Sequence, residues 1–421
     1  MVEMSEHKTT TSTEALLRGF RVLDLTTDPT GPYAAQNLAG LGAEVIKIER
    51  PHIGDPCRWN PPFVGPKGIA YEVKNPYDIS VQYLRRNRGK KSVFLNLRHE
   101  MGRELFKRLV KVSDVVIENF APGIMEANDL DYDRLKQVNP GIVFCSVSGY
   151  GQDSAYKESP GFDLMVQAAS GIMEMEGSLN RSSIRCGTWA GQMVPALWAT
   201  ISIMAALLSR EKTGRGDYID ISMQDACFSA AADEFLKTSS FQRTLLGEDE
   251  SPSRPAPWNV YPTRSGQIVI CVAQSSQWYA FLEVIGREDL RDDPRFKSQQ
   301  MRSRNADAID AITAAWLESL TADEAVNRLR EKKIPCERVS SFERAMADPR
   351  LISRRMIQEA MHPVYGKTGL KASGFPAKFW KGKAGFFSPA PYPGQHNEEI
   401  YMGLLGLSKE YMERLKEEEI I

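Results

Sequence analysis

The segment FRVLDLTTDPTGPYAAQNLAGLGAEVIKI, residues 20–48, carries the pattern that decides the fold. An apolar run, Phe20–Leu25, is followed by a helix-like stretch, Tyr33–Leu41, and by a second apolar run, Val45–Ile48. Short apolar runs that flank a helical pattern indicate a β-α-β unit, and such units favour a parallel sheet with helices on its faces. The segment therefore predicts an α/β, doubly wound, Rossmann-like domain.

The same alternation continues along the first half of the chain. Apolar runs and helical patterns follow one another at 92–97, 100–112, 114–118, 130–138 and 142–147. Two longer helical patterns follow, at 163–175 and 193–211, before a strand pattern at 218–223. We expect a large Rossmann-like domain over 15–229, after a disordered tail over 1–14.

The second half of the chain has a different pattern. A strand at 267–272 is followed by several helices, one of which begins with the capping box Thr321 to Glu324. These features predict a smaller α+β domain over 230–345. A strand near 356–362 and a helix near 409–418 predict that the C-terminal segment, 346–421, returns to the large domain.

The composition excludes several classes of partner. The chain has 53 basic and 54 acidic residues, and a net charge of -1 gives no reason to expect a nucleic-acid or membrane partner. The six cysteines are far apart, which favours a reducing cytoplasm over a disulfide framework. The most apolar stretch, 193–208, contains Pro195 and is shorter than the ~20 residues that span a bilayer. We expect a buried helix there.

The common cofactor and hydrolase motifs are missing. The turn Thr26–Pro32 follows the first strand without GxGxxG, so no NAD or FAD is expected. The five histidines have no metal-ligand spacing, and we expect no metal. No GxSxG elbow or P-loop appears.

Five stretches, found in this order along the chain, instead carry a resemblance to a family. They are Leu41-Gly42-Ala43-Glu44-Val45-Ile46-Lys47-Ile48-Glu49-Arg50-Pro51, Asn87-Arg88-Gly89-Lys90-Lys91-Ser92, Glu118-Asn119-Phe120-Ala121-Pro122-Gly123, Pro160-Gly161-Phe162-Asp163 and Lys212-Thr213-Gly214-Arg215-Gly216. Together they resemble class III CoA-transferases, including formyl-CoA transferases and carnitine CoA-transferase-like proteins. The resemblance is strong over about residues 18–230 and weak elsewhere.

The resemblance implies an interlocked dimer, with each active site between the large domain of one chain and the small domain of the other. It also implies coenzyme A or an acyl-CoA as substrate. The residues that it implies as CoA contacts are Arg50, Leu95, Leu97, Arg98, Asn119, Phe120 and Ile124. By position, the two arginines are the expected contacts to the phosphates of CoA. Asn119 and Phe120 are the expected contacts to its pantetheine arm. Without the resemblance, Arg50 would be interpreted as an ordinary charge at the end of a strand, and Asn119 as a residue that holds a turn.

Four positions depart from the family pattern. The family's nucleophilic aspartate corresponds to Gln192, and no Asp or Glu lies between Asn180 and Ser209. A neutral amide cannot replace a carboxylate nucleophile, so we predict no catalytic residue here. Ala127 replaces a usual arginine, Pro29 corresponds to a glutamine of formyl-CoA transferases, and Phe162 to the histidine of acyl-CoA racemases. Asp163 is interpreted as a structural residue or a bystander near the site.

These departures predict the non-catalytic subunit of a heteromer, paired with a homologous subunit that carries the aspartate. Within the family, the two-subunit succinyl-CoA:(R)-benzylsuccinate CoA-transferases of anaerobic toluene degradation resemble this arrangement. Two alternatives stay open. One is a homodimeric CoA-thioester-binding protein without catalysis, and the other is an active homodimeric transferase that uses another residue.

Overall fold

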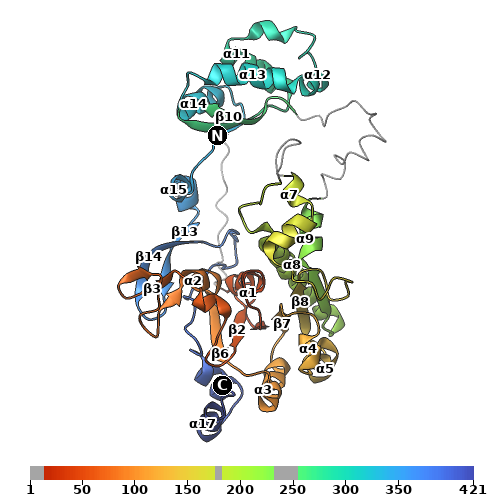
Figure 1. Ribbon diagram of the computed structural model, residues 1–421, viewed down its shortest axis with the longest axis vertical. Coiled ribbons are helices and arrows are strands. Elements are labelled where there is room, and N and C mark those ends of the chain that lie inside the picture. Colours follow the sequence, from red (N-terminus) through yellow and green to blue (C-terminus); the bar gives the residue numbers. More distant parts are fainter. Residues whose placement is uncertain (1–13, 176–182, 232–254) are drawn as a thin grey trace. The chain divides into compact units, whose positions relative to one another are not determined.

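The computed structural model describes residues 14–175, 183–231 and 255–421 (Figure 1). Its contacts divide the chain into two compact units, one formed by Met1–Asp233 with Arg354–Ile421 and the other by Glu234–Ser353. The predicted boundaries, after residues 229 and 345, lie near these divisions. Nearly all of the predicted tail over 1–14 lies outside the described residues.

A parallel sheet of six strands forms the centre of the first unit. Its strands, in spatial order, are β6 (Lys90–Phe94), β2 (Glu44–Glu49), β1 (Arg21–Asp24), β7 (Val115–Glu118), β8 (Val143–Ser148) and β9 (Tyr218–Ser222). All neighbouring strands pair in parallel. This is the strand order of the Rossmann fold, in which the order reverses between β1 and β7. The predicted Rossmann-like architecture is confirmed.

Successive residues of each strand face two separate cores. Val22 belongs to the core that includes α1 (Thr30–Gly40) and α8 (Ala190–Thr213). Leu23 belongs to the opposite core, which includes α3 (Glu100–Lys111), α5 (Tyr132–Val138) and α17 (Lys409–Glu417). Because the side chains of a strand alternate between the faces of a sheet, both faces must be covered. Helices cover both faces (Figure 1).

The helix α8 differs from the prediction of a buried helix. It has 24 residues and is, by length and composition alone, apolar enough to cross a membrane, but half of its apolar window is buried in the protein. One face packs in the core through residues such as Ala199 and Ile203. The other face exposes large apolar side chains, namely Leu197, Trp198, Ile201, Met204 and Leu208. The prediction was wrong because only one side of the helix lies against the sheet.

The helix predicted over 163–175 is two helices, α6 (Asp163–Ala169) and α7 (Ile172–Met175). Gly171 lies between them with a φ of 84°. This left-handed conformation is open to glycine and ends a helix. The prediction of one continuous helix was therefore wrong.

Smaller sheets and short helices complete the first unit. The strands β3 (Phe63–Gly65), β4 (Gly68–Ala70) and β5 (Ile79–Ser80) form one sheet, and β13 (Ile357–His362) and β14 (Gly366–Ser373) form a hairpin. A fourth core packs α2 (Val81–Arg86) against that hairpin. The remaining helical segments are a 3-10 turn (Pro56–Trp59), α4 (Ile124–Ala127), α9 (Met223–Ala230) and a π-helical turn (Glu399–Leu404).

The second unit is an α+β domain with its own core. Its antiparallel sheet contains β10 (Trp258–Thr263), β11 (Gly266–Cys271) and β12 (Cys336–Arg338). Its helices include α11 (Ser275–Ile285), α12 (Gln299–Arg304), α13 (Ala306–Leu317), α14 (Ala322–Glu331), α15 (Phe342–Met346) and α16 (Pro349–Ser353). The predicted capping box at Thr321 and Glu324 begins α14.

Candidate functional site

A cavity of about 350 Å³ lies at the carboxyl ends of β1, β2, β6 and β7. We call it the switch-point pocket, because the strand order reverses beside it, between β1 and β7. It is lined by Leu25, Thr26, Thr27, Lys47, Ile48, Glu49, Arg50, Gly54, Asp55, Leu95, Asn96, Leu97, Arg98, Phe120, Ala121, Ile124, Met125, Asn128 and Leu130. Open α/β sheets bind ligands in this crevice, because the loops after the strands converge there.

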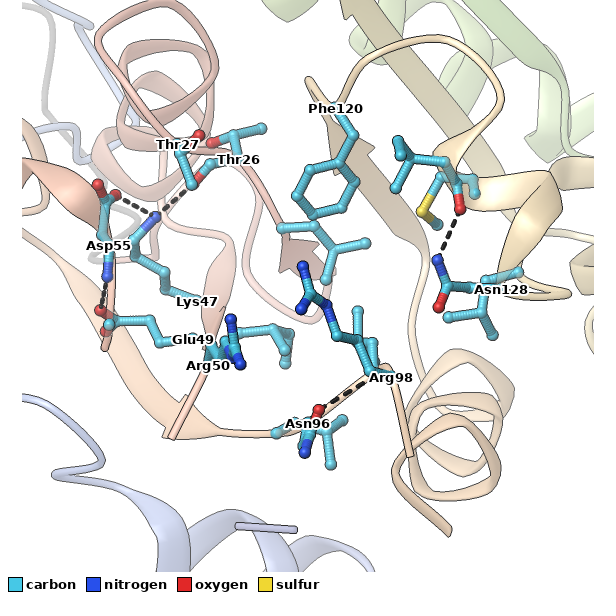
Figure 2. Close-up of a pocket in the computed structure, with 18 of the residues that line it drawn as sticks. Thr26, Thr27, Lys47, Glu49, Arg50, Asp55, Asn96, Arg98, Phe120 and Asn128 are labelled. Carbon is cyan, nitrogen blue, oxygen red and sulfur yellow. Dashed lines mark hydrogen bonds and ion pairs between the residues drawn. The ribbon is translucent and has the colours of Figure 1, made fainter. Parts of the chain in front are cut away.

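Six of the seven predicted CoA contacts line this one pocket, namely Arg50, Leu95, Leu97, Arg98, Phe120 and Ile124. Figure 2 shows Arg50, Arg98 and Phe120 gathered around the same space. Both arginines are exposed, and neither guanidinium group has an acidic partner within the described part of the chain. The pocket thus offers two free cations beside an apolar wall.

Asn119, the seventh predicted contact, does not line the pocket. Its side chain holds the β1–α1 turn, because Oδ1 accepts from the Thr27 amide at 2.8 Å and Nδ2 donates to the Thr27 carbonyl at 2.7 Å. Thr27 itself lines the pocket. The structure gives Asn119 a positioning role, and its direct contact with a ligand stays a prediction.

Buried charges hold the loops around the pocket. Lys47 is 1% exposed, donates to the Thr26 carbonyl at 2.6 Å and pairs with Asp55 at 2.8 Å (Figure 2). Burial opposes its charge, but the carboxylates of Asp24 and Asp55 outweigh burial and raise the pKa of Lys47. Lys90 pairs with Asp24 at 2.7 Å. The Lys47 contacts tie the turns after β1 and β2 to the sheet, and the Lys90–Asp24 pair joins β6 to β1.

Glu118, the last residue of β7, supports the Phe120 wall. Its Oε2 accepts from the Phe120 amide at 2.7 Å. Burial raises the pKa of Glu118 to about 7, although hydrogen bonds from Ser146 and the Phe120 amide act in the opposite direction. The backbone of the pocket wall at Phe120 is therefore hydrogen-bonded to a carboxyl group whose pKa is raised by burial.

A second cavity, of about 530 Å³, surrounds Gln192 in the first turn of α8. This Gln192 pocket is lined by Asp28, Pro29, Cys57, Asn60, Pro61, Gln82, Arg86, Phe162, Asp163, Leu164, Arg185, Trp189 and Gln192. Three of the four positions that depart from the family pattern, Pro29, Phe162 and Gln192, thus lie around one cavity. Both pockets draw on the turn after β1, with Thr27 in one and Asp28 in the other.

Asp163, the first residue of α6, and Gln192, in the first turn of α8, are both buried where these two helices pack together. Asp163 is 4% exposed and Gln192 is 7% exposed. A Cβ on Gly191 would lie 2.7 Å from the Asp163 carbonyl oxygen and 3.0 Å from Asp163 Oδ1. Only glycine at 191 permits this approach of α6 to α8. The carboxylate interpreted as a bystander therefore lies directly beside the expected nucleophile position.

One oxygen of each of these side chains has no hydrogen-bond donor. Asp163 Oδ2 accepts from Gln167 at 3.0 Å and lies 3.4 Å from Arg185. Asp163 Oδ1 and Gln192 Oε1 are buried and have no partner in the described structure. Arg185 was missed in the sequence because nothing in its surroundings marks it, and only the fold brings it to Asp163.

The Gln192 pocket has few groups able to attack a thioester. Gln192 is a neutral amide, and burial, together with Asp55, raises the pKa of Cys57 to about 12, so that thiol stays protonated. Asp163 is the buried carboxylate of the pocket. Among the described residues, no group of three or more His, Cys, Asp or Glu side chains is placed to hold a metal ion.

Comparisons with known proteins agree with the fold and show the family. The family model described as CoA-transferase family III matches residues 17–397. The chain is 31% identical to the succinyl-CoA:glutarate CoA-transferase of Homo sapiens over 92% of this chain and 86% of that protein. It is 30% identical to the formyl-CoA:oxalate CoA-transferase of Streptomyces coelicolor over 97% of this chain and 100% of that protein.

A solved structure is similar over almost the whole chain. The crystal structure of a CAIB/BAIF family protein from Brucella suis is 29% identical, with a TM-score of 0.78, and covers 93% of this chain and 100% of that one. The family match, the long alignments and the Rossmann-like sheet with its switch-point pocket lead to one conclusion. The chain belongs to CoA-transferase family III.

Proposed function

We propose that this chain is the non-catalytic subunit of a class III CoA-transferase and that it binds a CoA thioester in its switch-point pocket. The family membership supports transfer of CoA between an acyl-CoA and a carboxylic acid. The observation that carries the finer proposal is Gln192, which is buried at the position of the family's nucleophile and lines the pocket where the reaction would occur.

The switch-point pocket suits the chemistry of CoA. Its phosphates call for charge-assisted hydrogen bonds, and the free guanidinium groups of Arg50 and Arg98 supply donors for them. Phe120 and Ile124 provide apolar surface for the rest of the cofactor. Thr27 lines this pocket and the next residue, Asp28, lines the Gln192 pocket, and we infer that the acyl end of a bound thioester lies toward Gln192.

Loss of the nucleophile need not remove the chain from an active enzyme. A class III transferase carries out acyl transfer through an aspartate that forms a mixed anhydride and then a thioester with CoA. We infer that a homologous subunit supplies this aspartate and that the exposed apolar face of α8 contributes to the contact between subunits. The cytoplasm is the compartment consistent with such an enzyme.

The substrate proposal is narrower. Relatives named for succinyl-CoA and for dicarboxylic acids such as glutarate support succinyl-CoA as the donor. The two-subunit arrangement then favours a succinyl-CoA:(R)-benzylsuccinate CoA-transferase.

Asp163 favours one rival function. It is a buried carboxylate with a free oxygen in the same pocket, so an active homodimeric transferase that uses Asp163 has a structural basis. A homodimer that binds CoA thioesters without turnover is the other rival.

Purified chain alone, and chain co-expressed with an aspartate-bearing homologue, distinguish these functions. The proposal expects succinyl-CoA turnover only in the co-expressed complex, and native mass spectrometry should show both subunits in it. Turnover by the lone chain that disappears in Asp163→Asn would establish the active homodimer instead. If the lone chain forms a homodimer, binds CoA without turnover and forms no complex with the homologous subunit, the chain is the non-catalytic binding protein.

A further inference from the structure

Residues of the C-terminal segment cover the outer edge of β6. The Ser92 amide donates to His396 Nδ1 at 3.1 Å, and the Ser92 carbonyl accepts from the His396 amide at 2.9 Å. The Phe94 amide donates to Asn397 Oδ1 at 2.9 Å, and the Phe94 carbonyl accepts from Tyr401 Oη. Because every second residue of a strand turns its backbone groups to the same side, a third such contact is expected two residues after Phe94.

Asn96 makes that third contact, and it carries the series into the switch-point pocket. Its amide donates to the Ile420 carbonyl at 2.8 Å. Its side-chain Oδ1 accepts from the Arg98 amide at 3.2 Å (Figure 2), and Asn96 and Arg98 both line the pocket. A single residue thus joins Ile420 to one of the two arginines expected to contact CoA.

The chain turns after α17, and this turn aims the Ile420 carbonyl at Asn96. Glu419 has a φ of 54°, a left-handed conformation that residues other than glycine adopt rarely. The Ile420 amide donates to the Leu415 carbonyl at 2.8 Å, as in the Schellman motif that ends many helices. Ile420 and Ile421 are 0% and 6% exposed and belong to the core that includes α17. The turn thus returns this part of the chain to the core.

The conformation of Glu419, and not its side chain, holds this turn. The side chain is 74% exposed, and its Oε1 lies 3.8 Å from Nε2 of His52, which is 75% exposed. An exposed pair of this kind contributes little to stability, and it exists only while the histidine is protonated. A glycine at this position would therefore keep the turn, whereas a residue unable to adopt a positive φ would release Ile420 from Asn96.

We propose that residues 419–421 position Arg98 for a phosphate group of CoA. The turn at Glu419 holds the Ile420 carbonyl on the Asn96 amide, and Asn96 holds the Arg98 backbone. Arg98 is exposed and has no acidic partner within the described part of the chain, so these backbone contacts fix where its side chain starts. A guanidinium group held near its phosphate loses less conformational freedom on binding. This role rests on the proposed CoA site and extends it to residues outside the pocket.

Substitutions at residue 419 form a graded test. Glycine adopts the left-handed turn readily, valine adopts it with difficulty, and proline, with φ fixed at about −65°, cannot adopt it. In calorimetric titration of the full-length chain with CoA, Glu419→Gly should bind as tightly as the unaltered chain. Glu419→Pro should bind about tenfold more weakly, since a charge-assisted hydrogen bond is lost, and Glu419→Val should lie between them. Leu407→Ala, which removes a buried side chain from the same core, is the control for lost stability and should leave CoA affinity unchanged.

A double-mutant cycle shows whether the turn acts through Arg98. In the Arg98→Gln chain, Glu419→Pro should cause little further loss of CoA affinity, because the guanidinium group that the turn positions is absent. In a chain with the exposed Arg215→Gln, the matched control, Glu419→Pro should keep its full effect. An effect on stability alone would be the same in both chains.

Hydrogen exchange measures the first contact without CoA. The Asn96 amide should exchange faster in Glu419→Pro than in Glu419→Gly, while the amides of β1, in the interior of the sheet, keep their rates. If the β1 amides also exchange faster in Glu419→Pro, Glu419→Val, which perturbs the turn less, takes its place in every comparison.

Three results would overturn the inference: equal CoA affinity in the glycine, valine and proline variants, an equal loss in Glu419→Pro with and without Arg98, or unchanged exchange of the Asn96 amide. When the unaltered chain binds CoA, each of these results rejects only the positioning role. If the unaltered chain does not bind CoA, the CoA assignment of the proposed function is rejected, and the positioning role with it.

Discussion

At the scale of single residues, a carboxylate and an amide of similar size carry different chemistry in the first turn of α8. A carboxylate attacks a thioester and can leave again, whereas the Gln192 amide only donates and accepts hydrogen bonds. Gln192 is nevertheless buried, and Gly191 brings it close to Asp163. We propose that this arrangement is the backbone of the family's reactive site with an unreactive side chain at residue 192.

Arg98 tests the CoA assignment at this scale. Arg98→Gln should weaken CoA binding by about tenfold or more, because one charge-assisted hydrogen bond to a phosphate is lost. Calorimetry with CoA measures this change, and Arg215→Gln again serves as the control. Equal affinity of Arg98→Gln and the unaltered chain would remove Arg98 from the phosphate site.

Glu118 gives a prediction for the dependence of stability on pH. Its pKa is raised from 4.5 to about 7 in the folded chain, so between these values the folded state binds more protons than the unfolded state. Stability from this group is therefore present below pH 4.5 and is lost as the pH rises through 7, by up to about 3 kcal/mol.

Glu118→Gln removes that titration. Urea unfolding from pH 5 to pH 8 should show the variant gaining stability relative to the unaltered chain as the pH rises. A difference in unfolding free energy that stays constant over this range would show that Glu118 does not titrate there.

At the scale of elements, α8 has one apolar face in the core and a second apolar face exposed on the surface of the chain. Its buried face packs on the sheet through Ala199 and Ile203, while Leu197, Ile201 and Leu208 stay exposed. Apolar residues at this spacing form a stripe along one side of a helix, which is typical of a contact with another chain.

Ile201→Glu should therefore prevent assembly without unfolding the chain, since Ile201 is 57% exposed. Native mass spectrometry of the co-expressed subunits should show mainly separate chains, with a circular dichroism melt close to that of the unaltered chain. Val364→Glu, at an exposed hairpin position, is the control. Intact assembly in Ile201→Glu would exclude this face of α8 from the contact.

The strands β1, β7 and β8 were predictable because each is a short, mostly apolar run buried between two layers of helices, whereas β9 is half exposed and contains Asp220. The short strands β3 and β4 were not predictable, since three residues are too few to show a period of two. The break between α6 and α7 occurs at Gly171, which has a positive φ. It was not predictable, because a single glycine within a helical pattern does not by itself indicate the end of a helix.

The candidate CoA contacts came from the resemblance to the family, and their role stays a prediction. The fold explains why Arg50, Leu95 and Phe120 line one pocket, since they follow strands and the carboxyl ends of parallel strands meet at one edge of the sheet. Arg185 was not predictable, because it comes from an irregular segment and meets Asp163, 22 residues earlier in the chain, only through tertiary packing.

At the scale of the whole molecule, the account depends on two pockets that share the turn after β1. The switch-point pocket keeps the residues expected to bind CoA, whereas the Gln192 pocket gathers three of the departures from the family pattern. We propose that this chain retains the binding of CoA and relies on a related subunit for the chemistry.

The most direct test asks whether residue 192 alone decides whether this chain can be acylated by a CoA thioester. The unaltered chain and Gln192→Asp are each incubated with succinyl-CoA, so that an aspartate that attacks the thioester forms a mixed anhydride and then a thioester with the released CoA. Hydroxylamine converts that thioester into a hydroxamate, which peptide mass spectrometry locates. The account predicts a hydroxamate at residue 192 in Gln192→Asp and none in the unaltered chain. A hydroxamate on Asp163 of the unaltered chain would contradict it, because the chain would then have a nucleophile of its own.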